Sequence, residues 1–142
     1  MIKIRHTGIV SKNLKKSIYF WVNLIGFRVV KTLSEEGDLI DKIIGYKNAK
    51  VKTIKLEDNF KNLIEILFFL NSPKQPKTKI KPYSFGYTHI SLTVKNINYL
   101  YKNLKKNKII FNSAPKISAD GRVIMTYCKT PEGAYLELVE EL

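Results

Sequence analysis

The sequence predicts an α+β fold with two similar halves, each consisting of a strand, a helix and about three further strands. Three observations support this prediction. The segment RHTGIVSKNL, at residues 5–14, is matched in gap-free register by THISLTVKNI at residues 88–97. A helical pattern of apolar residues follows each copy. Each half then ends in an apolar strand that contains one glutamate within it.

The first strand of each half begins at one of the only two histidines in the chain, His6 and His89. The alternating pattern after each histidine predicts a β-strand, in which every second side chain points to the same face of the sheet. The two histidines therefore start the same face of equivalent strands. Asn13 and Asn96, or the residues just before them, suit the N-cap of the helix that follows.

The helices are predicted from apolar residues at helical spacing, over residues 14–25 in the first half and 97–104 in the second. Gly26 suits the end of the first helix, where a left-handed residue is needed. The strands FRVVKTL and KIIF are expected to leave the two helices. Residues 37–62 stay open between one long hairpin and a short helical turn near residues 41–45.

The closing strands NLIEILFF and AYLELVEE place Glu65 and Glu137 between apolar neighbours. Carboxylates are almost never fully buried without a partner, so a glutamate in the middle of an apolar strand needs an explanation. A glutamate in one such strand could simply lie on a solvent-exposed face of the sheet. Two glutamates at matching places indicate a shared role.

The expected organisation is a single domain over residues 1–142, with a first βαβββ module at 1–70, a linker at 71–85 and a second module at 86–142. Neither a membrane-spanning apolar run nor a signal peptide is present, and Cys128 is the only cysteine, so we expect a cytoplasmic protein. The net charge of +13 favours an anionic small molecule as partner. The lysines are scattered without an RNA-binding signature, so no nucleic acid is expected.

The two histidines and two glutamates can converge on one point if the halves are related by pseudo-twofold symmetry. His6, Glu65, His89 and Glu137 are therefore the predicted ligands of a divalent metal ion such as Zn, Ni, Co, Mn or Fe, with room left for water or substrate. The absence of thiolate ligands favours a catalytic site over a closed structural zinc site. In the alternative interpretation, the glutamates pair with lysines on a solvated sheet face and the histidines cap strands.

Three stretches, HTGIVSKNLKKSIYFWVNLIGF, THISLTVKNI and KTPEGAYLELVE, resemble the vicinal oxygen chelate superfamily. This superfamily includes glyoxalase I, methylmalonyl-CoA epimerase, extradiol dioxygenases and the bleomycin and fosfomycin resistance proteins. The last stretch is similar to a frequent Asp-Pro-x-Gly-x-x-x-Glu-Leu ending, with Thr130 in place of the Asp. The resemblance implies the glyoxalase/bleomycin resistance/dioxygenase fold, in which tandem βαβββ modules form a curled mixed sheet around a central cavity.

The resemblance also implies an activity, because the four ligands are similar to those of glyoxalase I and close to those of the epimerase. A metal-dependent lyase or isomerase would act through an enediolate on a small oxygen-chelating substrate, such as a hemithioacetal or a thioester. Glu137 or Glu65 would move the proton, and an epimerase-like enzyme would need a second base at Glu35 or Glu36. Two alternatives stay open: a metal-free binding protein of the bleomycin resistance type and an Fe(II) extradiol-type dioxygenase. Relatives in this superfamily also imply a homodimer, with the site within one chain or between two.

Overall fold

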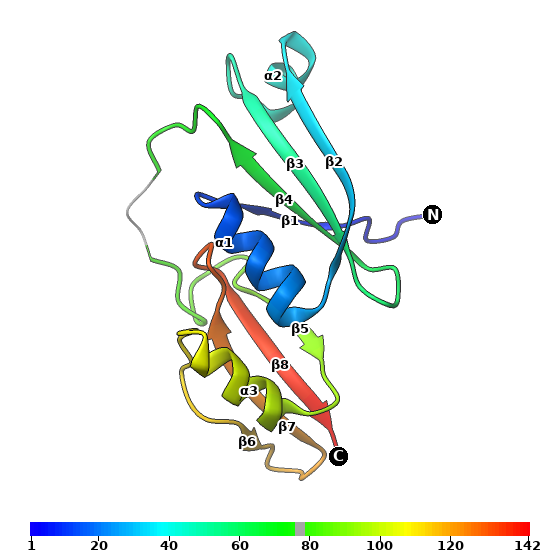
Figure 1. Ribbon diagram of the computed structural model, residues 1–142, viewed down its shortest axis with the longest axis vertical. Coiled ribbons are helices and arrows are strands. Elements are labelled where there is room, and N and C mark those ends of the chain that lie inside the picture. Colours follow the sequence, from blue (N-terminus) through cyan, green and yellow to red (C-terminus); the bar gives the residue numbers. More distant parts are fainter. Residues whose placement is uncertain (76–78) are drawn as a thin grey trace. The chain divides into compact units, whose positions relative to one another are not determined.

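The computed structural model describes residues 1–75 and 79–142 and divides the chain into two compact units, Met1–Lys77 and Thr78–Leu142. Each unit contains a four-stranded mixed sheet and runs from a strand to a helix and then to three more strands (Figure 1). The predicted α+β fold of two tandem βαβββ modules is thus confirmed. Residues 76–78 of the predicted linker lie outside the described residues.

The sheet of the first unit has the strand order β1-β4-β3-β2, with β1 parallel to β4 and the other neighbours antiparallel. Its strands are β1 (Thr7–Val10), β2 (Arg28–Glu36), β3 (Lys50–Glu57) and β4 (Leu63–Phe69). Its helices are α1 (Leu14–Ile18), the π-helix η1 (Tyr19–Ile25) and α2 (Asp38–Ile44).

The helix after β1 begins where the sequence predicts. The side chain of Asn13 accepts a hydrogen bond from the Lys16 backbone N–H at 3.0 Å and so caps the first turn. Gly26 ends η1 in the left-handed conformation, with a φ of 98°, which glycine adopts without steric cost. Trp21 lies fully buried on this helix and makes edge-to-face contacts with Phe20 and Phe27.

The segment between β2 and β3 contains a short helix, α2, which decides between the two possibilities that the sequence left open. Gly45 ends α2 with a φ of 73°. The carboxylate of Asp41 accepts hydrogen bonds from the backbone N–H groups of Asn48 at 2.6 Å and Ala49 at 2.8 Å. These two bonds fix the loop that leads from α2 into β3.

The second unit repeats this plan with the strand order β5-β8-β7-β6, and β5 is parallel to β8. Its elements are β5 (His89–Thr93), α3 (Ile97–Lys106), β6 (Lys116–Ile117), β7 (Val123–Lys129) and β8 (Tyr135–Glu141). The side chain of Asn96 caps α3 by accepting a hydrogen bond from the Tyr99 backbone N–H at 2.9 Å, as Asn13 does for α1.

The prediction of a strand at residues 108–111, KIIF, is wrong. Phe111 forms only an isolated bridge with Cys128, although the Ile110 carbonyl accepts a hydrogen bond from the Lys129 N–H at 2.9 Å. A bend begins at Asn112, whose N–H still donates to the Tyr127 carbonyl at 3.0 Å, and no regular ladder forms. The edge strand β6 is instead the two residues Lys116–Ile117.

Most of the core of each unit lies on one face of its sheet, although Val51 of β3 and Tyr135 of β8 are buried on the face that carries the glutamate. In β4 the neighbours of Glu65, Ile64 and Ile66, are buried, and in β8 Leu136 and Leu138 are fully buried beside Glu137. Because side chains alternate along a strand, the two glutamates project from the opposite face. In the described part of the chain, no helix is long and apolar enough to cross a membrane.

Candidate functional site

In the first unit, the structure brings together one imidazole and one carboxylate. Gly8 of β1 lies opposite Glu65 of the parallel strand β4, and His6 precedes Gly8 by two residues, on the same face. The Nε2 atom of His6 lies 3.3 Å from Oε2 of Glu65. The imidazole is about one third exposed and the carboxylate largely buried, at 32% and 13% side-chain exposure, so the pair borders open space on this face.

The second unit repeats the same arrangement. Ser91 of β5 lies opposite Glu137 of the parallel strand β8, and His89 precedes Ser91 by two residues. The Nε2 atom of His89 lies 3.9 Å from Oε2 of Glu137. Each unit therefore carries a glutamate on the strand parallel to its first strand and a histidine at the same offset from it. His89 is the first residue of β5, and His6 lies directly before β1.

The sequence reasoning missed a third residue beside each glutamate. Lys55 of β3 lies opposite Glu65, and Tyr127 of β7 lies opposite Glu137. The Nζ atom of Lys55 lies 3.1 Å from Oε1 of Glu65, so each oxygen of this carboxylate has its own partner. The alternative interpretation of the sequence, in which the glutamates pair with lysines, therefore applies to Glu65, which pairs with Lys55. Strand alternation could have placed Lys55 on this face, but it could not show which residue it opposes.

Tyr127 contacts both members of the second pair. Its hydroxyl lies 3.5 Å from Nε2 of His89, and the two rings meet edge to face with centroids 5.2 Å apart. Burial and the hydrogen bond with the Glu137 carboxylate raise the pKa of Tyr127. The hydroxyl therefore stays protonated and can donate a hydrogen bond at neutral pH.

The ring of His89 is held from its other side. Thr88 Oγ1 lies 2.9 Å from Nδ1 of His89, which leaves Nε2 as the nitrogen that faces Glu137. A hydrogen bond at one ring nitrogen is the usual way in which a metal-binding imidazole is oriented.

The two glutamates proposed as a second base point in different directions. The carboxylate of Glu35 accepts a hydrogen bond from Thr53 Oγ1 at 3.3 Å, and Thr53 shares a sheet face with Glu65. Glu36 points to the opposite face and lies 3.5 Å from the Lys50 ammonium, where both side chains are well exposed. Only Glu35 therefore lies on the face that carries the His6–Glu65 pair.

The donor atoms of the two pairs fit a divalent metal of borderline or hard character, since imidazole nitrogen and carboxylate oxygen are the ligands that such ions prefer. Within either unit, residues 1–75 and 79–142 contain no group of three or more His, Cys, Asp or Glu side chains that could hold a metal. Each unit thus carries two of the four predicted ligands. Cys128 is not a candidate, because it is fully buried and burial raises its pKa to about 12.

Comparison with known proteins identifies the fold independently. The model of the Glyoxalase/Bleomycin resistance protein/Dioxygenase superfamily matches residues 3–138. A glyoxalase family protein from Bacillus cereus has a TM-score of 0.88 at 21% identity, covering 100% of this chain and 95% of its own. A glyoxalase family protein from Enterococcus faecalis has a TM-score of 0.69 at 22% identity, covering 97% of each chain.

A solved structure of known activity is also similar. The trypanothione-dependent glyoxalase I of Leishmania major has a TM-score of 0.66 at 19% identity, covering 99% of this chain and 88% of its own. A search of curated proteins gave no significant match. At these identities the solved structures establish the shared fold.

Proposed function

The chain belongs to the Glyoxalase/Bleomycin resistance protein/Dioxygenase superfamily, and from this premise we propose that it is a metal-dependent lyase or isomerase of the glyoxalase I or epimerase type. Its proposed substrate is a small anionic molecule with neighbouring oxygen atoms, such as a hemithioacetal or a thioester. One observation carries the proposal: each unit presents one imidazole and one carboxylate from equivalent positions of its fold.

His6, Glu65, His89 and Glu137 would hold the metal ion. When bound, a divalent ion supplies Lewis-acid polarisation of the substrate oxygens. Thr88 holds the His89 ring by Nδ1 and so keeps Nε2 directed at the site. The remaining chemistry, which is the transfer of a proton on the carbon next to a carbonyl, falls to the protein's carboxylates.

Glu137 is our preferred residue for that proton transfer. Both oxygens of Glu65 are engaged, one by His6 and one by the Lys55 ammonium. The Glu137 carboxylate has no lysine or arginine within ion-pair distance among the described residues, and its contact with His89 is longer, at 3.9 Å. Glu137 would therefore have only the metal ion, and no lysine or arginine, to release before its oxygens meet the proton of the substrate. In an epimerase-type reaction, Glu35 would be the second base, because it lies on the same face as Glu65.

A metal-free binding protein is the alternative that one observation favours. The ammonium of Lys55 already compensates the charge of Glu65, so this half of the set is stable without a metal. Under this alternative the protein would bind an aromatic or drug-like molecule and would catalyse no reaction.

The test is turnover of a hemithioacetal and of a methylmalonyl thioester by protein loaded in turn with Zn, Ni, Co, Mn or Fe. We expect metal-dependent conversion of one of them, and a fall in kcat of at least about 100-fold in Glu137→Gln, the typical contribution of a general base. Glu36→Gln is the matched control and should retain full activity. Oxygen uptake with a catechol would instead support the dioxygenase alternative, and no turnover with any metal would contradict the enzymatic proposal.

The homodimer also stays a prediction for this chain. Light scattering coupled to size-exclusion chromatography measures the mass in solution, and a monomeric mass would contradict it.

A further inference from the structure

Two lysines lie directly opposite each other on the face that carries the His6–Glu65 pair. Lys31 of β2 is the cross-strand partner of Lys55, which in turn is the partner of Glu65 on β4. Directly opposite residues of antiparallel strands point to the same face, so the two ammonium groups share the face with Glu65. Like charges at directly opposite positions are destabilising, and this placement therefore calls for an explanation.

A β-bulge produces this placement. Val29 lies opposite Leu56, but the next register pair is Lys31 with Lys55, so the strand β2 carries one extra residue, Val30. In a regular ladder the apolar Val30 would lie opposite Lys55. Bulges near active sites commonly redirect a side chain, and here the redirected side chain is a cation.

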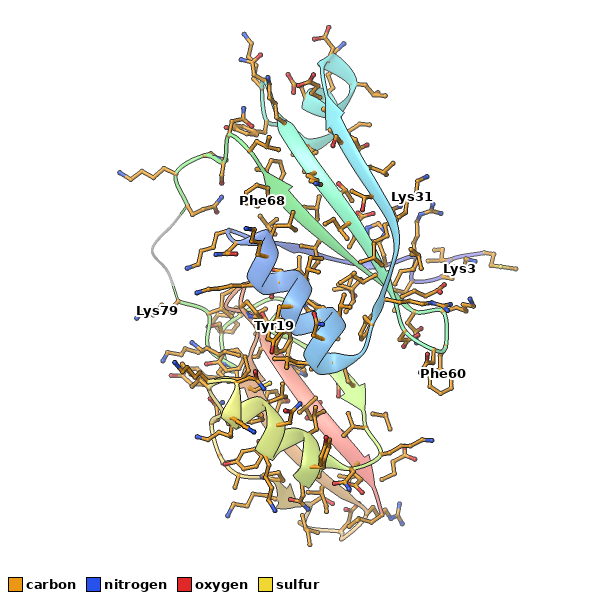
Figure 2. The ribbon with its side chains drawn as sticks, viewed as in Figure 1. Lys3, Tyr19, Lys31, Phe60, Phe68 and Lys79 are labelled. Carbon is orange, nitrogen blue, oxygen red and sulfur yellow. The ribbon has the colours of Figure 1, made fainter. Side chains whose placement is uncertain are left out.

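The two lysines differ in their partners. Lys55 is largely buried, at 23% side-chain exposure, and it forms an ion pair with Glu65. Lys31 is exposed on the edge strand β2, as Figure 2 shows, and it forms no ion pair with any residue in 1–75 or 79–142. The second unit has no such pair, because the neutral Tyr127 stands where Lys55 stands in the first.

We propose that Lys31 and Lys55 form an anion subsite that binds a carboxylate of the substrate next to the His6–Glu65 pair. The identification of this anion as a substrate group rests on the proposed function. A divalent ion held by His6 and Glu65 would draw on the negative charge of that carboxylate and so weaken its hold on the Lys55 ammonium, and both lysines would then be available to the same ligand. The ligand is therefore a small molecule whose carboxylate lies beside its metal-binding oxygens.

The charges around Glu65 agree with this proposal. Lys31 and Lys55 contribute two positive charges, and Glu65 and Glu35 two negative ones. Beside them Glu57 pairs with both Arg28 and Lys61, so this part of the face carries a small excess of positive charge even without a metal. A bound divalent ion leaves an excess of positive charge that an anionic ligand compensates. A neutral substrate would leave the two opposed ammonium groups unpaired.

Lys55 can also be released without any metal, and the experiment uses this. In Glu65→Gln the side chain keeps its size but no longer holds Lys55 by charge. Binding of oxalate, a small dicarboxylate, is measured by titration calorimetry on chelator-treated protein at fixed low ionic strength. Glu65→Gln should bind oxalate roughly tenfold more tightly than the wild type, as expected for one new charge-assisted hydrogen bond.

Double variants show which lysine is responsible for the tighter binding of oxalate. E65Q/K55M should bind oxalate no more tightly than the wild type, and E65Q/K31M should lose most of the increase in affinity. E65Q/K52M should bind oxalate as tightly as Glu65→Gln. Lys52 is the matched control, because it lies on the same strand as Lys55 but on the opposite face. All three double variants carry the wild-type net charge, and E65Q/K55Q provides a second neutral replacement if E65Q/K55M fails to fold.

The proposal is overturned if Glu65→Gln binds oxalate no more tightly than the wild type, or if E65Q/K55M retains the gain. Because no metal is present, the result is independent of metal binding. A protein that shows this gain but takes up no metal would overturn the proposed function and leave the anion subsite standing.

Discussion

The ion pair between Lys55 and Glu65 should stabilise the first unit by a measurable amount in the absence of metal. The two charged atoms are 3.1 Å apart, and the side chains are 23% and 13% exposed. Exposed ion pairs contribute about 0.2–1 kcal/mol, whereas breaking a buried pair costs about 3–5 kcal/mol. This pair lies between those limits, so we expect a coupling free energy of about 1–2 kcal/mol, allowing for solvent at Lys55.

The coupling is measured by a double-mutant cycle with Lys55→Met, Glu65→Gln and the double variant, each unfolded in urea in the presence of a chelator. The pair Lys50 and Glu36 serves as the control, because its atoms are 3.5 Å apart and its side chains are 60% and 69% exposed. That control cycle should give a coupling below about 0.5 kcal/mol. Additive effects at Lys55 and Glu65, or equal coupling in the two cycles, would refute the assignment of this pair as a partly buried contact.

Three further predictions concern stability and reactivity. Because burial raises the pKa of the Cys128 thiol to about 12, iodoacetamide should alkylate it only as fast as the protein unfolds, and rapid labelling of the native protein would contradict its burial. Ile66 is fully buried, so Ile66→Ala should lower the free energy of unfolding in urea by about 2–5 kcal/mol; a loss under about 1 kcal/mol would place it outside the core. The hydrogen bond from Arg28 holds the pKa of Glu57 below its ordinary value of 4.5. The stabilisation that ionised Glu57 contributes is therefore present above pH 4.5 and disappears as the pH falls through the lower pKa of the folded state. Glu57→Gln should therefore reduce the loss of unfolding free energy between neutral and acid pH. An unchanged loss at acid pH would argue against this contact.

The sequence predicted the fold because its local signals agreed with one another. The repeat that begins at His6 and His89 indicated two like modules, and Asn13 and Asn96 marked helices that begin as expected. These signals depend on neighbours along the chain, and a single sequence displays them directly. Period-two alternation also placed His6 and Gly8 on one face, and in the structure that face carries Glu65.

The neighbours across the sheet could not be predicted in the same way. Lys55 and Tyr127 stand beside the two glutamates because of strand register, which depends on hairpin loops and bulges. The bulge at Val30 alone decides that Lys31 and not a valine lies opposite Lys55. No local pattern in the sequence marks that bulge.

The expected strand at residues 108–111 shows a different limit. Its apolar, β-branched composition is typical of a strand, and Ile110 does bond to β7 through its carbonyl. Propensity predicts an extended conformation there, but a continuous ladder also needs the following residues to keep an extended backbone. Asn112 and Ser113 still bond to β7, but the chain bends at these residues and the ladder does not continue.

Metal stoichiometry tests the central claim most directly. Protein purified without a histidine tag and incubated with Ni, Co, Zn, Mn or Fe is analysed for bound metal, together with His6→Ala, Glu65→Gln, His89→Ala and Glu137→Gln. We predict a single divalent ion per chain, and an affinity at least about tenfold lower in every variant, since each removes a ligand. Absence of bound metal under all of these conditions, or variants that bind it as the wild type does, would contradict the assignment of these four residues as ligands.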